Sequence, residues 1–172
     1  MIFLRSIICL AFFLFSFFDS DPAYVKRAEK IMNKTMERLA KKHDMSPSGT
    51  TGGMIDTVNI VGFSFQKLEV LSKDEAREIV VDCAEELLRA FNEDEKIRPH
   101  LRDYPFTTEN IKVSVFLKTS DYDRIYYPDF SVARVSSGRV VFSASEEGKV
   151  QLLTYKEEEP YEEALSIVRG EE

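Results

Sequence analysis

The 172-residue chain is poor in the residues on which metal and disulfide sites depend. It contains two cysteines, two histidines and no tryptophan. Cys9 lies inside an apolar N-terminal run, so its removal on export would leave Cys83 alone and exclude an intramolecular disulfide. The histidines, His43 and His100, lie in different segments, and neither H-E-x-x-H nor a paired-cysteine zinc spacing is present. We therefore expect no metal and no cofactor.

Motifs of common hydrolases and nucleotide-binding proteins are also missing. There is no G-x-S-x-G elbow and no Walker sequence. The glycines of GTTGG, residues 49–53, precede a predicted strand, whereas a phosphate cradle needs a glycine loop that leads into a helix. We interpret this stretch as part of a flexible loop over residues 43–54.

The charge balance argues against nucleic acid as a partner. The formal net charge is −7, and phosphate binding needs a net basic face. The distribution is uneven, because residues 24–43 hold seven basic and two acidic residues, while KEEEPYEE near the C-terminus is strongly acidic. The basic segment marks either a surface that meets an anionic partner or a solvated helix face.

The N-terminus predicts export. Arg5 precedes an apolar run over residues 6–18 that would reach about 20 Å as a helix, short of a membrane core of roughly 30 Å. We interpret residues 1–20 as a signal peptide. No A-x-A-like pair of small residues follows, so an uncleaved signal anchor stays open, and Cys9 lacks the small neighbours of a lipid anchor.

Three helices are predicted. The first helix spans residues 21–43 and has apolar side chains on one face. Its opposite, outer face is basic and carries Arg27, Lys30, Lys34, Arg38 and Lys41. Ser72 and Glu75 form a capping box at the start of the second helix, whose apolar stripe includes Cys83 as a buried small hydrophobe. Pro160 opens a final short helix.

Strands are predicted over residues 55–71, 111–117, 130–135, 139–145 and 149–155. In the first of them the apolar residues change face near Gly62, which indicates a bulge or a strand that is buried on both sides. The fold class is therefore α+β, with one domain over residues 21–172. We expect an antiparallel sheet of four to five strands with helices on one face, in the order α-β-α-β-β-β-β-α.

The segment KIRPHLRDYPFT, residues 96–107, is the first candidate site. Its two prolines favour extended backbone, and its apolar residues could pin it across the seam between helix and sheet. Arg98, His100, Arg102 and Tyr104 could also form an anion-binding or acid–base cluster. We favour a structural connector, because nothing nearby supplies a nucleophile.

The loop SDYDRIYYPD is the second candidate. Its aspartates are reminiscent of a calcium loop, but Tyr126 and Val132 stand where that motif needs Gly and Glu. Tyr122, Tyr126 and Tyr127 could form a contact surface, because tyrosine buries a large area at low entropic cost. Packing under the sheet is the alternative.

The motifs GTTGGM, IRPHLRDYPFTTENI and YEEALSIV resemble a family of small uncharacterised exported proteins of chlamydia-like and Legionella-type intracellular bacteria. The resemblance spans most of residues 21–168. It implies a leader followed by one α+β domain at a bacterial envelope or host interface, and it supplies no activity, cofactor or catalytic residue.

We therefore expect an exported binding protein, envelope-associated or secreted, with a protein partner and no nucleic acid. The expected contact residues are Tyr122, Tyr126, Tyr127, Arg98, His100 and Arg102. One alternative is a small hydrolase-like enzyme that uses His100 with nearby carboxylates. Another is a membrane-anchored protein whose basic helix lies on the bilayer. The ligand and the oligomeric state stay open.

Overall fold

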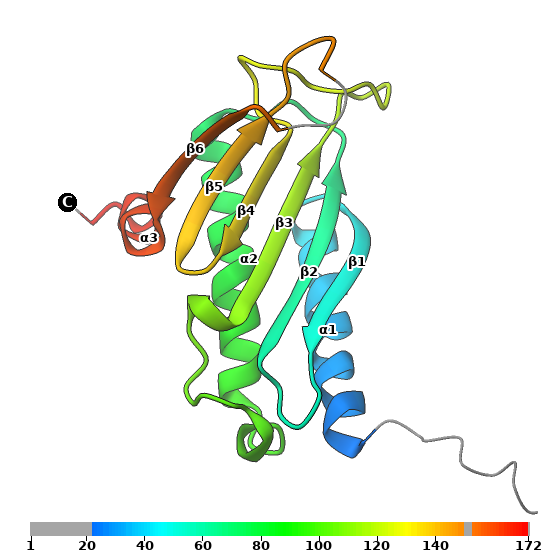
Figure 1. The fold of residues 1–172 in the computed structure, drawn as a ribbon, viewed down its shortest axis with the longest axis vertical. Coiled ribbons are helices and arrows are strands. Elements are labelled where there is room, and N and C mark those ends of the chain that lie inside the picture. Colours follow the sequence, from blue (N-terminus) through cyan, green and yellow to red (C-terminus); the bar gives the residue numbers. More distant parts are fainter. Residues whose placement is uncertain (1–21, 150–152, 172) are drawn as a thin grey trace, which may run out of the picture.

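The computed structural model describes residues 22–149 and 153–171, and in this part the chain forms a mixed sheet covered by helices (Figure 1). The predicted signal segment lies outside the described residues. The helices are α1 (Ala23–Lys42), α2 (Lys73–Glu93) and α3 (Tyr161–Arg169), with short 3-10 turns η1 (Arg98–His100) and η2 (Thr108–Asn110). The strands are β1 (Ser46–Gly53), β2 (Ile60–Lys67), β3 (Ile111–Leu117), β4 (Val132–Ser136), β5 (Arg139–Ala144) and β6 (Tyr155–Pro160).

The strands lie side by side in chain order, and the α+β class is confirmed. The expected antiparallel sheet is wrong in one place, because β2 and β3 pair in parallel while all other neighbours are antiparallel. Helix α2 connects β2 to β3. It carries the chain back to the end of the sheet at which β2 began, so the two strands run in the same direction.

The sheet has one strand more than the five that we predicted, and this additional strand is β1, where we expected a flexible loop. Its residues, SPSGTTGG, have low strand propensity and almost all are exposed. They form a strand because β2 offers backbone partners along most of their length, from Ser46 opposite Gln66 to Gly53 opposite Ile60. Backbone pairing with a neighbour that is distant in sequence overrides the local preference.

For the next strand two predictions were open, and the bulge near Gly62 is wrong. Burial on both sides is found over part of the strand, because the consecutive residues Val61, Gly62 and Phe63 are all buried. From Val61 to Lys67, β2 keeps an unbroken register with β3, and Val61, Phe63 and Phe65 are all buried. Gly62 serves close backbone approach, because a Cβ atom there would lie 2.0 Å from the Lys112 carbonyl oxygen. The irregularity lies in β1 instead, between Pro47 and Gly49.

The last strand begins later than predicted. We placed it over residues 149–155, whereas β6 spans Tyr155–Pro160 and contains the acidic run. Alternate residues Glu157 and Glu159 contact the cations Lys73 and Arg77 of α2. These long-range ion pairs allow an acidic segment to run beside β5. Its composition alone does not predict a strand.

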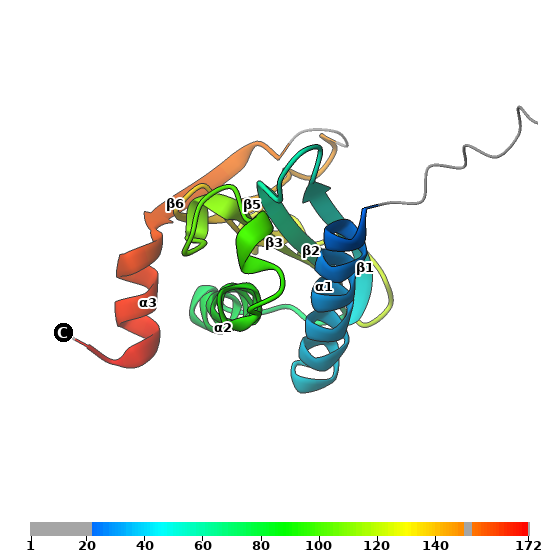
Figure 2. The same cartoon turned by 90° about the horizontal axis from the view of Figure 1, so that it is seen from below.

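All three helices lie on one face of the sheet (Figure 2). Helix α1 packs on β1 and β2, α2 crosses the centre at β3 and β4, and α3 lies beside β6. The predicted capping box at Ser72 is confirmed. One hydrophobic core fills the space between the layers, and its largest members include Phe65, Phe91 and Phe142. In the described ranges, no helix covers the opposite face of the sheet.

Candidate binding surface at one end of the sheet

The tyrosine loop, residues 118–131, joins β3 to β4 at the end of the sheet where β3 finishes (Figure 1). A tight turn forms its tip: the Thr119 N–H donates to the Asp123 carbonyl at 3.1 Å, and the Tyr122 N–H donates to the Thr119 carbonyl at 3.0 Å. Tyr122 has a φ of 66° and its side chain is 62% exposed. The turn therefore presents this aromatic ring to solvent.

The base of the same loop is held by β5 and β6. The Tyr127 N–H donates to the Ser145 carbonyl at 3.0 Å, and Tyr126 forms a bridge with Ser145. The Tyr127 ring lies 4.5 Å from that of Tyr155, centre to centre, while its side chain stays largely exposed. Phe130 packs on Phe142 of the core, at 5.3 Å between ring centres. The loop is therefore anchored by aromatic packing.

A pocket of about 230 Å³ lies beneath this loop, on the uncovered side of the sheet. Phe116 of β3 lines it and is 43% exposed, although it pairs in regular register with Val132 of β4. Ile125, Tyr126 and Val132 add apolar surface, and Lys118 and Arg124 contribute basic groups to its lining. The chemistry suits an apolar side chain of a partner, bordered by polar contacts.

The second predicted group lies at the opposite end of the sheet, before β3 begins (Figure 1). Arg98 Nε donates to the Asn92 carbonyl at 2.8 Å, and its guanidinium lies 5.5 Å from the centre of the Tyr104 ring. It thereby satisfies a carbonyl at the C-terminal end of α2. The tyrosines and the basic group do not form one site.

Two further contacts dock the basic segment. The His100 ring stacks on Tyr24 of α1, with 5.0 Å between ring centres. Val58 exchanges two backbone hydrogen bonds with the segment, donating to the His100 carbonyl at 2.8 Å and accepting from the Arg102 N–H at 3.0 Å. Arg98 and His100 are thus engaged in holding the connection, while the Arg102 side chain is exposed.

Catalytic chemistry finds little support in these contacts. Among the described residues, the His100 ring has no hydrogen bond or ion pair with a carboxylate. Cys83 is fully buried on α2, and burial raises the pKa of its thiol, so the thiolate is disfavoured. The structural interpretation of Cys83 is confirmed.

Residues 22–149 and 153–171 contain no group of three or more His, Cys, Asp or Glu side chains that could hold a metal ion. No described helix is both long enough and apolar enough to cross a bilayer.

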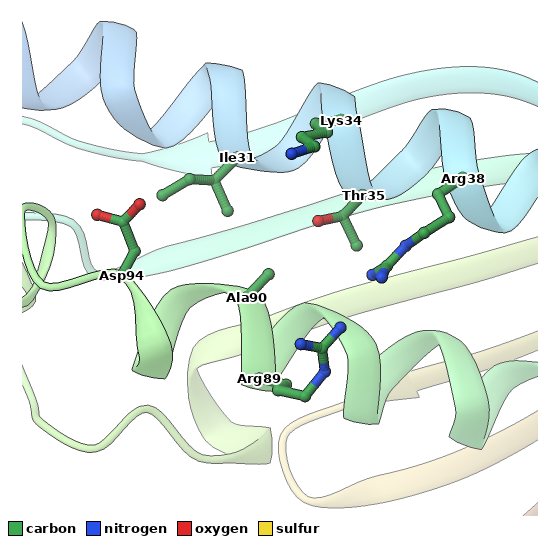
Figure 3. Close-up of a pocket in the computed structure, with 7 residues that line it drawn as sticks. All are labelled: Ile31, Lys34, Thr35, Arg38, Arg89, Ala90 and Asp94. Carbon is green, nitrogen blue, oxygen red and sulfur yellow. The ribbon is translucent and has the colours of Figure 1, made fainter.

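Sequence reasoning missed a groove between α1 and α2. It has a volume of about 280 Å³ and is lined by Ile31, Lys34, Thr35, Arg38, Arg89, Ala90 and Asp94 (Figure 3). Lys34 and Arg38 belong to the basic outer face predicted for α1. Nothing local in the sequence shows that this face meets α2.

No protein-family model, curated protein or solved structure matches the chain. The family resemblance of the three motifs therefore stays a prediction.

Proposed function

We propose that the chain is an exported binding protein that receives a polypeptide partner at the tyrosine-loop end of its sheet. Export rests on the N-terminal sequence, and binding rests on the surface at residues 116–132. The observation that carries the binding proposal is the exposure of Phe116 beside an apolar pocket. A large aromatic side chain left in water on a regular strand gives no folding benefit, but it gains free energy when a partner covers it.

The neighbouring tyrosines extend this surface. Tyr122 and Tyr127 project their rings from a loop whose base is fixed to β5 and β6, so a partner need not order the loop when it binds. Tyrosine and phenylalanine are both enriched in protein interfaces, and tyrosine is also enriched among the residues that dominate their energy. The partner would insert an apolar side chain between Phe116 and Ile125 and lie across Tyr122.

Site-specific photo-crosslinking in the native cell tests this surface. A photoreactive phenylalanine analogue replaces Phe116, Tyr122 or, as a matched control, Tyr104, which is 56% exposed at the opposite end of the sheet. We expect one discrete adduct from positions 116 and 122, and none from position 104. Equal adducts from all three positions, or none from any, would overturn the proposal.

A second variant separates the pocket from the loop. With the crosslinker at position 122, Phe116→Thr should reduce the adduct at least tenfold, because it removes the apolar floor of the pocket while keeping a residue that favours strands. Unchanged urea unfolding of this variant would show that the loss reflects binding.

Intact mass after separation of soluble and membrane fractions tests export. We expect a soluble species that lacks about twenty N-terminal residues. The full-length 19.8 kDa species in the membrane fraction would instead indicate a retained anchor.

A further inference from the structure

The groove between α1 and α2 brings basic groups of both helices together (Figure 3). The Arg38 and Arg89 guanidinium groups extend toward each other from opposite walls, and both contact the same oxygen, Oε2 of Glu86. For Arg89 this distance is 2.7 Å. The two cations are therefore close enough to share one ligand.

The positive charges in the groove outnumber the carboxylates that pair with them. Glu86 serves both arginines, and Arg89 has a further ion pair with Glu93 at 3.0 Å. Asp94 also lines the groove, but it is committed to Arg27, whose Nε lies 3.0 Å from Oδ2. Lys34 has no ion pair with any described residue. Several N–H donors of the guanidinium groups and the Lys34 ammonium thus remain for another anion.

Thr35 is the least expected residue of the groove. It occupies the buried face of α1, between the core residues Met32 and Leu39, and it is only 4% exposed. Its hydroxyl points into the groove (Figure 3), and it has no hydrogen-bond partner in the described ranges. The oxygen itself is open to the groove, because Arg139 Nε is the only fully buried side-chain polar atom without a hydrogen-bond partner in the described ranges. A ligand in the groove can therefore pair with the Thr35 hydroxyl in place of water.

We propose that this groove binds a phosphate group, held by Lys34, Arg38 and Arg89 and by the Thr35 hydroxyl. A phosphate offers several oxygens that match planar guanidinium donors and a mobile ammonium at once. The volume exceeds that of the anion, and Ile31 and Ala90 provide apolar contact for the group that carries it. The phosphate belongs either to a soluble phosphoester or to a lipid headgroup.

Two probes distinguish these sources. The protein as isolated from its native compartment is titrated with inorganic phosphate and followed by calorimetry. The same protein is sedimented with phosphatidylcholine vesicles that contain or lack one fifth phosphatidic acid. Binding of free phosphate without preference for the acidic vesicles supports a soluble ligand. Preference for the acidic vesicles supports a lipid headgroup. Absence of both overturns the proposal.

Matched variants assign the binding to the groove. Lys34→Gln should weaken binding about tenfold, because a hydrogen bond to a charged partner is lost. Lys30→Gln removes the same charge from the same helix at an exposed position outside the groove lining, and it should change binding less than twofold. An equal loss of phosphate affinity in Lys34→Gln and Lys30→Gln would show that binding is non-specific electrostatic attraction, and it would overturn the proposal.

Thr35→Val tests the part that charge cannot explain. It preserves the shape and the β-branched side chain while removing the hydroxyl, so the helix should fold as before. We expect weaker phosphate binding with unchanged urea unfolding. Unchanged binding by Thr35→Val alone would remove Thr35 from the site. Unchanged binding by both Thr35→Val and Lys34→Gln would refute the site itself.

Discussion

Arg77 of α2 and Glu159 of β6 form a buried ion pair with two contacts, in which Nε lies 2.6 Å from Oε1 and Nη2 lies 3.0 Å from Oε2. The guanidinium also contacts Asp74 and lies 5.9 Å from the centre of the Phe142 ring. The planar fork and the carboxylate satisfy each other, so this pair joins the start of α2 to the edge strand.

We expect Arg77→Met to lower the free energy of unfolding by about 3–5 kcal/mol, because it leaves the Glu159 carboxylate buried without its main partner. Lys73 Nζ, at 3.7 Å, is a weaker substitute. Urea unfolding measures the loss. Arg169→Met is the control, since its pair with Glu85 is half exposed and should contribute at most about 1 kcal/mol. A double variant with Glu159→Leu should recover much of the loss, and a double variant no better than Arg77→Met would contradict this account.

Asp82 gives the fold a dependence on acid. Burial raises its pKa, but hydrogen bonds from Lys42 at 2.7 Å and His43 at 2.6 Å outweigh burial, so the pKa of Asp82 is held below its usual value. A carboxylate with a lowered pKa stabilises the fold above its unfolded pKa, near 3.9, and that contribution disappears as the pH falls through the folded pKa.

Asp82→Asn should therefore cost about 1–2 kcal/mol at pH 7, since hydrogen bonds to a charged acceptor are weakened. The difference from the wild-type protein should shrink as the pH falls below about 4. Urea unfolding at a series of pH values measures both. Glu78→Gln, at an exposed position of the same helix, should track the wild-type protein throughout. A constant difference between wild type and Asp82→Asn at every pH would exclude the titration of Asp82 as the cause.

Elements with a strong local pattern could be predicted from the sequence. The capping box at Ser72, the apolar stripe of α2 and the alternation of β3 each depend on residues within a few positions of one another. The elements that were missed depend on distant partners. The acidic segment of β6 can lie in the sheet because Glu159 meets Arg77, 82 positions away. β1 is a strand because β2 supplies backbone partners along one of its sides.

The candidate sites follow the same division. The tyrosine loop is visible in the sequence because its residues are adjacent, although the exposure of Phe116 beside it is not. The groove could not be predicted, because Arg38 and Glu86 are 48 positions apart and meet only when α1 packs on α2. Thr35 was a local signal, a polar residue at a buried position of an apolar stripe, but its neighbours across the groove were unknown.

Gly62 is required by the parallel pairing of β2 with β3. Gly62→Ala would place a methyl group 2.0 Å from the Lys112 carbonyl oxygen, and backbone on both strands would have to move. We expect a loss of about 3 kcal/mol or more in the free energy of unfolding. Gly49→Ala is the matched control on β1, because its nearest contact would be the Ser64 hydroxyl at 3.8 Å. Equal changes for the two variants in urea unfolding would show that the close approach to the Lys112 carbonyl does not require glycine at position 62.

His100 can be tested as a stacking residue and as an acid–base group with one pair of variants. Its ring lies nearly parallel to that of Tyr24, at 15°, and such aromatic pairs contribute about 0.5–1.5 kcal/mol. His100→Ala should therefore lower the free energy of unfolding by about 1 kcal/mol, while His100→Phe should retain most of it. Both variants should keep the crosslinked adduct from position 122, because His100 lies at the other end of the sheet. An adduct lost in both variants with stability unchanged would assign His100 a direct role in function, since phenylalanine can replace the stacking but not the proton chemistry.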